Sequence, residues 1–123
     1  MKRLTIMVCT HNRWKLLQQL LHSINSASRP VDWEVGILVA ANACTDETHQ
    51  FLDSYIVQAD EKGWLSLEWF AEPVPGKSSA LNSAIKRADG DLVALIDDDQ
   101  RVAEDFFVNL CKLADSNQDA SIF

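Results

Sequence analysis

The sequence has no run of lysine or arginine residues. Eleven basic side chains stand against eighteen acidic ones, which gives a formal net charge of −7 over 123 residues. Proteins that bind nucleic acid neutralise its phosphates with clustered cations, and those contacts dominate the affinity. The composition therefore excludes nucleic acid as a polymeric partner.

Cysteine is also scarce. Cys9, Cys44 and Cys111 are odd in number and far apart along the chain. This arrangement offers neither a disulfide framework nor a paired-cysteine metal site. We therefore expect a reducing, cytoplasmic environment.

Long apolar runs are absent. The longest ones, residues 35–41 and 92–96, fall well short of the roughly 18 residues that a membrane-spanning helix requires. The apolar stretch after Lys2 and Arg3 reaches the polar His11 within about seven residues, at the lower limit for a signal peptide. We expect a soluble chain with no membrane segment.

What the sequence does contain is a regular alternation of apolar runs and amphipathic segments. Hydrophobic residues make up 47% of the chain and charged ones 24%, as is usual for one globular domain. The pattern predicts strands at residues 4–9, 35–40, 65–69 and 92–96, helices near 14–24, 51–63, 80–88 and 106–114, and a strand beginning at 120. The expected helix N-caps are Asn12 and either Ser78 or Ser79, and the expected stops are Gly63 and Gly90.

Continuous apolar strands that alternate with helices indicate a parallel sheet covered on both faces. The predicted fold is one α/β domain over residues 1–123, with an open, mostly parallel sheet. The polar alternation in residues 65–69 places that strand toward an edge. Ligands of such sheets bind outside the carboxyl ends of the strands. We therefore expect residues 10–13, 42–46, 76–79 and 97–99 to meet at one rim.

Three adjacent carboxylates, Asp97, Asp98 and Asp99, follow the most apolar strand. They repel one another unless a cation or water lies close. Mg²⁺ or Mn²⁺ binds through a few carboxylates and completes its shell with water and substrate phosphate. The alternative is that these acids cap the helix that follows.

The segment Gly76-Lys77-Ser78 has two interpretations. With Ala71 it satisfies a loose Walker A pattern, but Pro73 and Pro75 remove backbone amides that would hold phosphate. A lysine at a helix N-terminus still favours an anion, and a solvated lysine is the simpler alternative.

The remaining polar residues point to no other chemistry. An aspartate-nucleophile phosphatase is disfavoured because Arg101 stands where that motif has threonine or valine. The three histidines, His11, His22 and His49, lack the spacing of a zinc site. Solvated or capping roles are therefore expected for them.

Taken together, five segments resemble family 2 glycosyltransferases of the GT-A fold. They are VCTHNR at 8–13, NACTD at 42–46, PGKSSALN at 75–82, ADGD at 88–91 and LIDDD at 95–99. The resemblance covers essentially the whole chain but only the nucleotide-sugar-binding half of such enzymes. It implies a nucleoside-diphosphate sugar as donor and a transferase, inverting and of the hexosyl type, in the longer parent.

The resemblance also implies roles for individual residues. Asp99 and Asp97 would hold Mn²⁺ or Mg²⁺ as the DxD motif, with Asp97 toward the ribose or sugar and Asp98 between them. The residues implied to bind the nucleotide sugar are Thr10, Asn12, Arg13, Asn42, Asp46, Lys77, Asn82, Asp97 and Asp98.

Two departures from the family pattern bear on these expectations. Ala41 stands where the family usually has an aspartate that helps to read the base. The acceptor site and the general base would lie beyond Phe123, so no catalytic residue is assigned.

We expect this chain alone to bind a donor without turning it over. A non-catalytic nucleotide-binding module and, less favoured, a P-loop nucleotidase are the alternatives. A sheet cut short would leave an unpaired edge, so a homodimer through that edge is expected. The parent is placed in the cytoplasm, with the inner face of the membrane as a further location.

Overall fold

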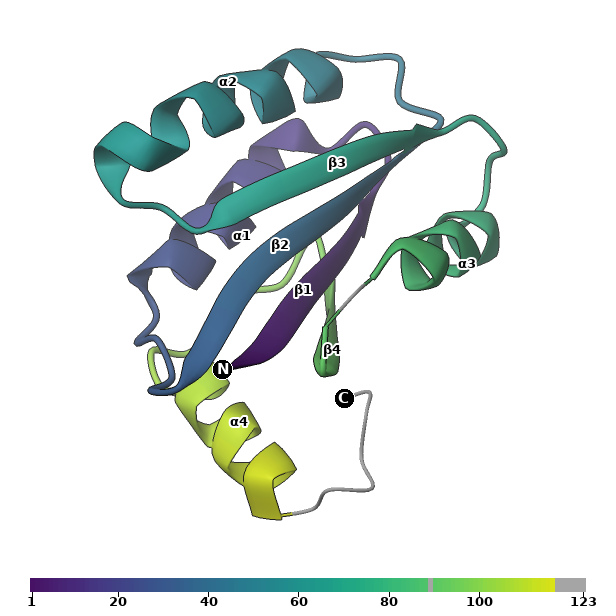
Figure 1. The fold of residues 1–123 in the computed structure, drawn as a ribbon. Coiled ribbons are helices and arrows are strands. Elements are labelled where there is room, and N and C mark those ends of the chain that lie inside the picture. The colour runs from purple at the N-terminus through teal and green to yellow at the C-terminus, as the bar shows by residue number, and fades with distance from the viewer. Residues whose placement is uncertain (89, 117–123) are drawn as a thin grey trace.

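The computed structural model describes residues 1–88 and 90–116. Strands and helices alternate along the chain, as Figure 1 shows. The elements are β1 (Lys2–Thr10), α1 (Trp14–Ser26), β2 (Trp33–Asn42), α2 (Thr48–Lys62), β3 (Ser66–Glu72), α3 (Lys77–Arg87), β4 (Leu92–Asp97) and α4 (Phe106–Ser116). This order confirms the predicted α/β class. The strand predicted from residue 120 lies outside the described residues.

The four strands form one parallel sheet in the order β3-β2-β1-β4. The chain runs outward from β1 to β3 and then returns to the other side of β1 for β4. Ligands of open parallel sheets bind where the strand order reverses in this way. In the register between β1 and β4, Cys9 lies opposite Asp97. The loops that follow these two strands therefore begin side by side.

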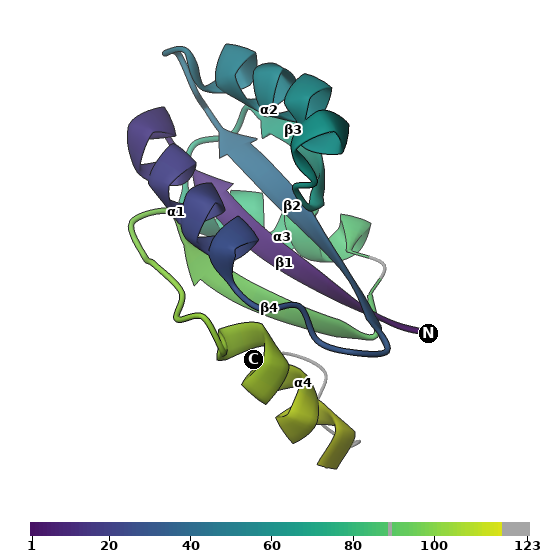
Figure 2. The same ribbon diagram turned by 90° about the vertical axis from the view of Figure 1, so that its left-hand side faces the viewer.

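Helices cover both faces of the sheet, with α1 and α2 in front of it and α3 behind it in Figure 2. On one face, α1, α2 and α4 bury Leu20, Leu52 and Phe107 in the larger core. On the other face, α3 packs through Ala80 and Ala84. Burial on both faces explains why the strands are continuous apolar runs. Within the described residues, no helix is long and apolar enough to cross a bilayer.

A half-buried side-chain amide joins α1, α2 and the residue that precedes β3. Asn25 donates through Nδ2 to the Leu21 carbonyl and the Tyr55 hydroxyl, each at 3.0 Å, and accepts through Oδ1 from the Leu65 N–H at 2.8 Å. The Tyr55 hydroxyl donates to the Leu65 carbonyl at 2.8 Å. Burial raises the pKa of Tyr55. These bonds fix both helices on the sheet, away from the carboxyl ends of the strands.

The helix boundaries agree with the sequence pattern except at their caps. Gly63 ends α2 with a left-handed φ of 69°, as predicted. The prediction of Asn12 as N-cap of α1 is wrong, because Arg13 holds that position and Asn12 has a φ of 51°. The stop predicted at Gly90 is also misplaced, because α3 ends at Arg87.

Both edges of the described sheet are open to further pairing. β3 is one edge, as its half-polar pattern predicted, and β4 is the other. Leu95 of β4 is 40% exposed. An exposed edge strand with apolar side chains favours pairing with another chain.

We predict that the chain forms a homodimer through the exposed edge strand β4. Light scattering at high concentration should give a mass about twice the 13.8 kDa of the chain. Leu95→Glu should return the mass to that of the monomer, because charge on an edge strand opposes pairing. A monomer at the highest soluble concentration would contradict the prediction.

Candidate functional site

A cavity of about 470 Å³ lies at the carboxyl ends of the strands. Its volume falls in the usual range for small-molecule sites, roughly 300–1,000 Å³. Each of the four strands contributes to it through its last residues or the loop that follows. The lining residues are Cys9, Thr10, His11, Arg13, Asn42, Pro75, Gly76, Lys77, Asp97, Asp98 and Asp99. Residues from each of the four polar segments thus line one cavity, as predicted.

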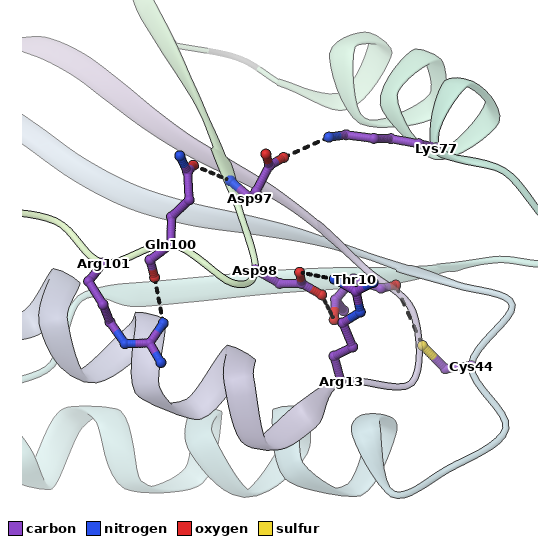
Figure 3. Close-up of polar contacts among 8 residues, drawn as sticks. All are labelled: Thr10, Arg13, Cys44, Lys77, Asp97, Asp98, Gln100 and Arg101. Atoms are coloured by element: carbon purple, nitrogen blue, oxygen red, sulfur yellow. Dashed lines mark hydrogen bonds and ion pairs between the residues drawn. The ribbon is translucent and has the colours of Figure 1, made fainter.

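Asp98 is buried within this rim. It is 5% exposed, and its Oδ2 accepts a hydrogen bond from the Thr10 hydroxyl at 2.9 Å (Figure 3). Arg13 places Nη1 3.4 Å from Oδ1 of the same carboxylate. A buried carboxylate is stable only when donors or cations replace water around it. The Thr10 hydroxyl and the Arg13 guanidinium fulfil this need and join the β1 loop to the end of β4.

Asp97 pairs with a lysine from the other side of the cavity. Lys77 Nζ lies 2.7 Å from Asp97 Oδ1 (Figure 3), and the two side chains are 67% and 53% exposed. The hydrogen bond to Asp97 and its negative charge raise the pKa of Lys77. The Asp97 N–H donates to Gln100 Oε1 at 2.8 Å, which closes the turn after β4. An exposed ion pair contributes at most about 1 kcal/mol, so a ligand can exchange with either partner.

Asp99 is exposed and makes no hydrogen bond or ion pair with the described part of the chain. Asp97 and Asp99 thus present carboxylate oxygens, the ligands that Mg²⁺ and Mn²⁺ prefer. Across the described ranges 1–88 and 90–116, no three acidic, histidine or cysteine side chains form a ready metal cage. Two carboxylates fit a Mg²⁺-type ion that takes its other ligands from water and substrate phosphate.

Asn42 is 6% exposed at the end of β2, and its side-chain hydrogen bonds go to the last residue of β3, Glu72, and to Val74 and Gly76 of the turn before α3. The backbone carbonyl of Asn42 lies 2.7 Å from His11 Nδ1, which donates to it in the matching tautomer. The preceding residue, Ala41, is 1% exposed and packs in the larger core. The position where the family usually has an aspartate therefore brings no polar group to this site.

Three predicted site residues do not line the cavity: Asn12, Asp46 and Asn82. Asn12 accepts through Oδ1 from the backbone N–H groups of Thr45 and Asp46 at 2.7 and 3.2 Å. Asp46 accepts from the Thr48 N–H at 3.0 Å, at the start of α2. Asn12 and Asp46 thus shape the loops around the site.

Four lining residues are not among the predicted site residues: Cys9, His11, Pro75 and Gly76. His11 and Gly76 lie within the segments expected at the rim, and Cys9 and Pro75 directly precede those segments. Burial raises the pKa of the Cys9 thiol. Gly76, with a φ of 120°, holds the N-cap position of α3 and corrects the prediction of Ser78 or Ser79.

Two solved structures that resemble this fold hold nucleotide sugars. The crystal structure of S. aureus TarS 1-349 in complex with UDP-GlcNAc has a TM-score of 0.76 and 25% identity, over 96% of this chain and 32% of that one. The mannosyltransferase PcManGT from Pyrobaculum calidifontis, in complex with GDP-Man and Mn²⁺, has a TM-score of 0.78 and 30% identity, over 92% and 32%. The chain thus spans about a third of these proteins.

A search of curated proteins found no match. The family model of glycosyl transferase family 2 matches residues 5–123, which include most of β1, all of β2, β3 and β4, and every residue of the cavity. With the parallel sheet and the acidic rim after β4, this match shows that the chain belongs to glycosyl transferase family 2.

Proposed function

We propose that this chain binds a nucleoside-diphosphate sugar with Mn²⁺ or Mg²⁺, and that the protein containing it transfers the sugar to an acceptor hydroxyl. The observation that carries the proposal is the layout of charge in the cavity. Asp97 and Asp99 offer exposed carboxylates, and Lys77 faces them from the start of α3. The sugar nucleotides bound by TarS and PcManGT, and the Mn²⁺ of PcManGT, support this assignment.

The charges explain why a metal ion and a diphosphate would bind together. Two exposed carboxylates repel a diphosphate in the absence of a cation. When bound, a divalent ion supplies Lewis-acid stabilisation of the charge that develops on the leaving diphosphate. Lys77 adds a second positive charge at the N-terminus of α3, where the helix dipole also favours an anion. We assign Asp97 and Asp99 to the metal and Lys77 to the phosphates.

The remaining predicted residues divide by position. We assign Thr10, Arg13 and Asn42 to the nucleotide side of the cavity, because they lie at or just after the carboxyl ends of β1 and β2. Asn12 and Asp46 support that side by fixing the two loops to each other. Asn82 belongs to the segment of α3 that we assign to the cleft, and Asp98 to the junction between Asp97 and Asp99. We place the domain in the cytoplasm, and its parent among inverting hexosyltransferases.

The first test is calorimetric titration of UDP, GDP, CDP, dTDP, ATP and GTP with Mn²⁺ and again with EDTA. We expect one nucleoside diphosphate to bind only with Mn²⁺, and Asp99→Asn to abolish that binding. Thermal unfolding of Asp99→Asn should match that of the unaltered chain, because the Asp99 side chain is exposed and makes no hydrogen bond or ion pair with residues 1–88 or 90–116.

Two outcomes would contradict the donor site. One is binding that ignores both Mn²⁺ and Asp99, which would favour a nucleotide-binding module of another kind. The other is ATP or GTP binding that is lost in Lys77→Met but survives Asp97→Asn, as a phosphate loop would require.

Lys77 should strengthen the binding of a Mn²⁺ nucleoside diphosphate and weaken the binding of Mn²⁺ alone. Lys77→Met should weaken binding of the Mn²⁺ diphosphate roughly ten- to a hundredfold, because a charged hydrogen bond to phosphate is lost. The same variant should bind Mn²⁺ alone up to about fivefold more tightly, because an exposed cation no longer pairs with Asp97. Parallel titrations check this, and a loss of both affinities would show a general structural defect instead.

Asp98 should behave as a structural carboxylate. Asp98→Ala should lower the free energy of unfolding by about 1–3 kcal/mol, because Thr10 and Arg13 lose their shared partner. Urea unfolding measures this change, and Asp99→Asn is the matched control because its carboxylate is exposed. Equal stability of the two variants would contradict the role of the buried contact.

A further inference from the structure

We propose that Asn42 is a positioning residue for Lys77, and that it acts by holding the turn at Gly76. The inference adds to the proposed function a residue that controls how the diphosphate-facing cation is placed. Its consequences for ligand binding rest on that function. Its structural part concerns only the segment between β3 and α3.

The side chain of Asn42 forms three hydrogen bonds with residues 72–76. Nδ2 donates to the Val74 carbonyl at 2.7 Å and to the Glu72 carbonyl at 3.3 Å, while Oδ1 accepts from the Gly76 N–H at 3.0 Å. Both N–H donors and the oxygen of this amide are thus hydrogen-bonded, and the residue is 6% exposed. A buried amide in this state has no free donor to give to a ligand. Its influence on the cavity must pass through the segment that it holds.

The segment has few other means of holding its shape. Pro73 and Pro75 have no N–H to donate. The Val74 N–H donates at 3.3 Å to the carboxylate of Glu72, the last residue of β3, which also accepts from the Ser83 hydroxyl of α3 at 2.6 Å. The other N–H of residues 73–76 is that of Gly76, and it donates to Asn42. Asn42 therefore supplies the contacts that tie this turn to β2.

The turn determines where Lys77 lies. Gly76 has a φ of 120°, and α3 begins at the next residue, Lys77. The Lys77 ammonium then lies 2.7 Å from Asp97, across the cavity from its own helix (Figure 3). Losing the Asn42 amide would free the Gly76 N–H and let the start of α3 shift. The Lys77 ammonium would then lie beside Asp97 in a smaller fraction of molecules.

The test compares the buried Asn42 with the half-buried Asn25, whose side chain has the same bonding pattern. Asn42→Ala removes the proposed tie, and Asn25→Ala removes the amide between α1, α2 and β3 that also uses two donors and one acceptor. UDP and GDP are titrated with Mn²⁺ against each variant and against each combined with Lys77→Met. Asn42→Ala should weaken the tighter of the two complexes on the order of tenfold, and by less than about twofold once Lys77 is replaced. Asn25→Ala should change the affinity less than about twofold in either background.

Amide hydrogen exchange without ligand provides a second readout. Asn42→Ala should speed exchange at residues 76–80, and Asn25→Ala should leave these residues unchanged. If Asn42→Ala does not fold, Asn42→Asp replaces it, because it keeps the acceptor for Gly76 and loses both donors. Its exchange should then be faster than that of the unaltered chain in the same residues.

The outcomes separate the two proposals. If the unaltered chain binds neither diphosphate but exchange quickens as expected, the proposed function fails and the positioning of the turn stands. Equal losses of affinity in the presence and absence of Lys77, or unchanged exchange at residues 76–80, would overturn the role of Asn42.

Discussion

The rest of the site depends on the contacts of one buried carboxylate, that of Asp98, at the ends of β1 and β4. Asp98 is 5% exposed, and its charge is stabilised by the Thr10 hydroxyl and the Arg13 guanidinium. This contact holds the turn after β4 against the loop after β1, at the reversal of the strand order. It also leaves Asp97 and Asp99, its two neighbours, exposed at the rim. One acid of the three thus serves the fold, and the other two face the cavity.

The loops of the rim are held by side-chain amides because they have little regular backbone pairing. Buried backbone donors and acceptors must find partners, and asparagine can satisfy both kinds at once. Asn12 joins the loop after β1 to that after β2, and Asn42 joins the end of β2 to the turn before α3. Lys77 and Asp97, which come from different elements, meet across a cavity whose walls are fixed in this way.

The periodicity of the sequence predicted the fold and the location of the site well. Strand residues such as Ile6 and Val39 are buried on a covered sheet, and polar segments that follow parallel strands must share one edge. Contacts between distant residues had no such local pattern. Asn42 meets Val74 and Gly76 only because the register of β2 and β3 places Asn42 opposite Glu72. The inward direction of Asp98 likewise depends on Arg13, 85 residues away.

The most direct test of the donor site is to record two-dimensional NMR spectra of the ¹⁵N-labelled chain with Mn²⁺ and UDP or GDP. The measurement is the paramagnetic broadening of each backbone amide signal by Mn²⁺. Mn²⁺ held by Asp97 and Asp99 should broaden the amide signals of residues 97–99 first, then those of residues 10–13 and 77. Signals from Asn25 and Tyr55, which bond to Leu65 at the opposite end of β3 from the cavity, should stay sharp. Broadening centred on any other part of the chain, or none with either nucleotide, would contradict the account.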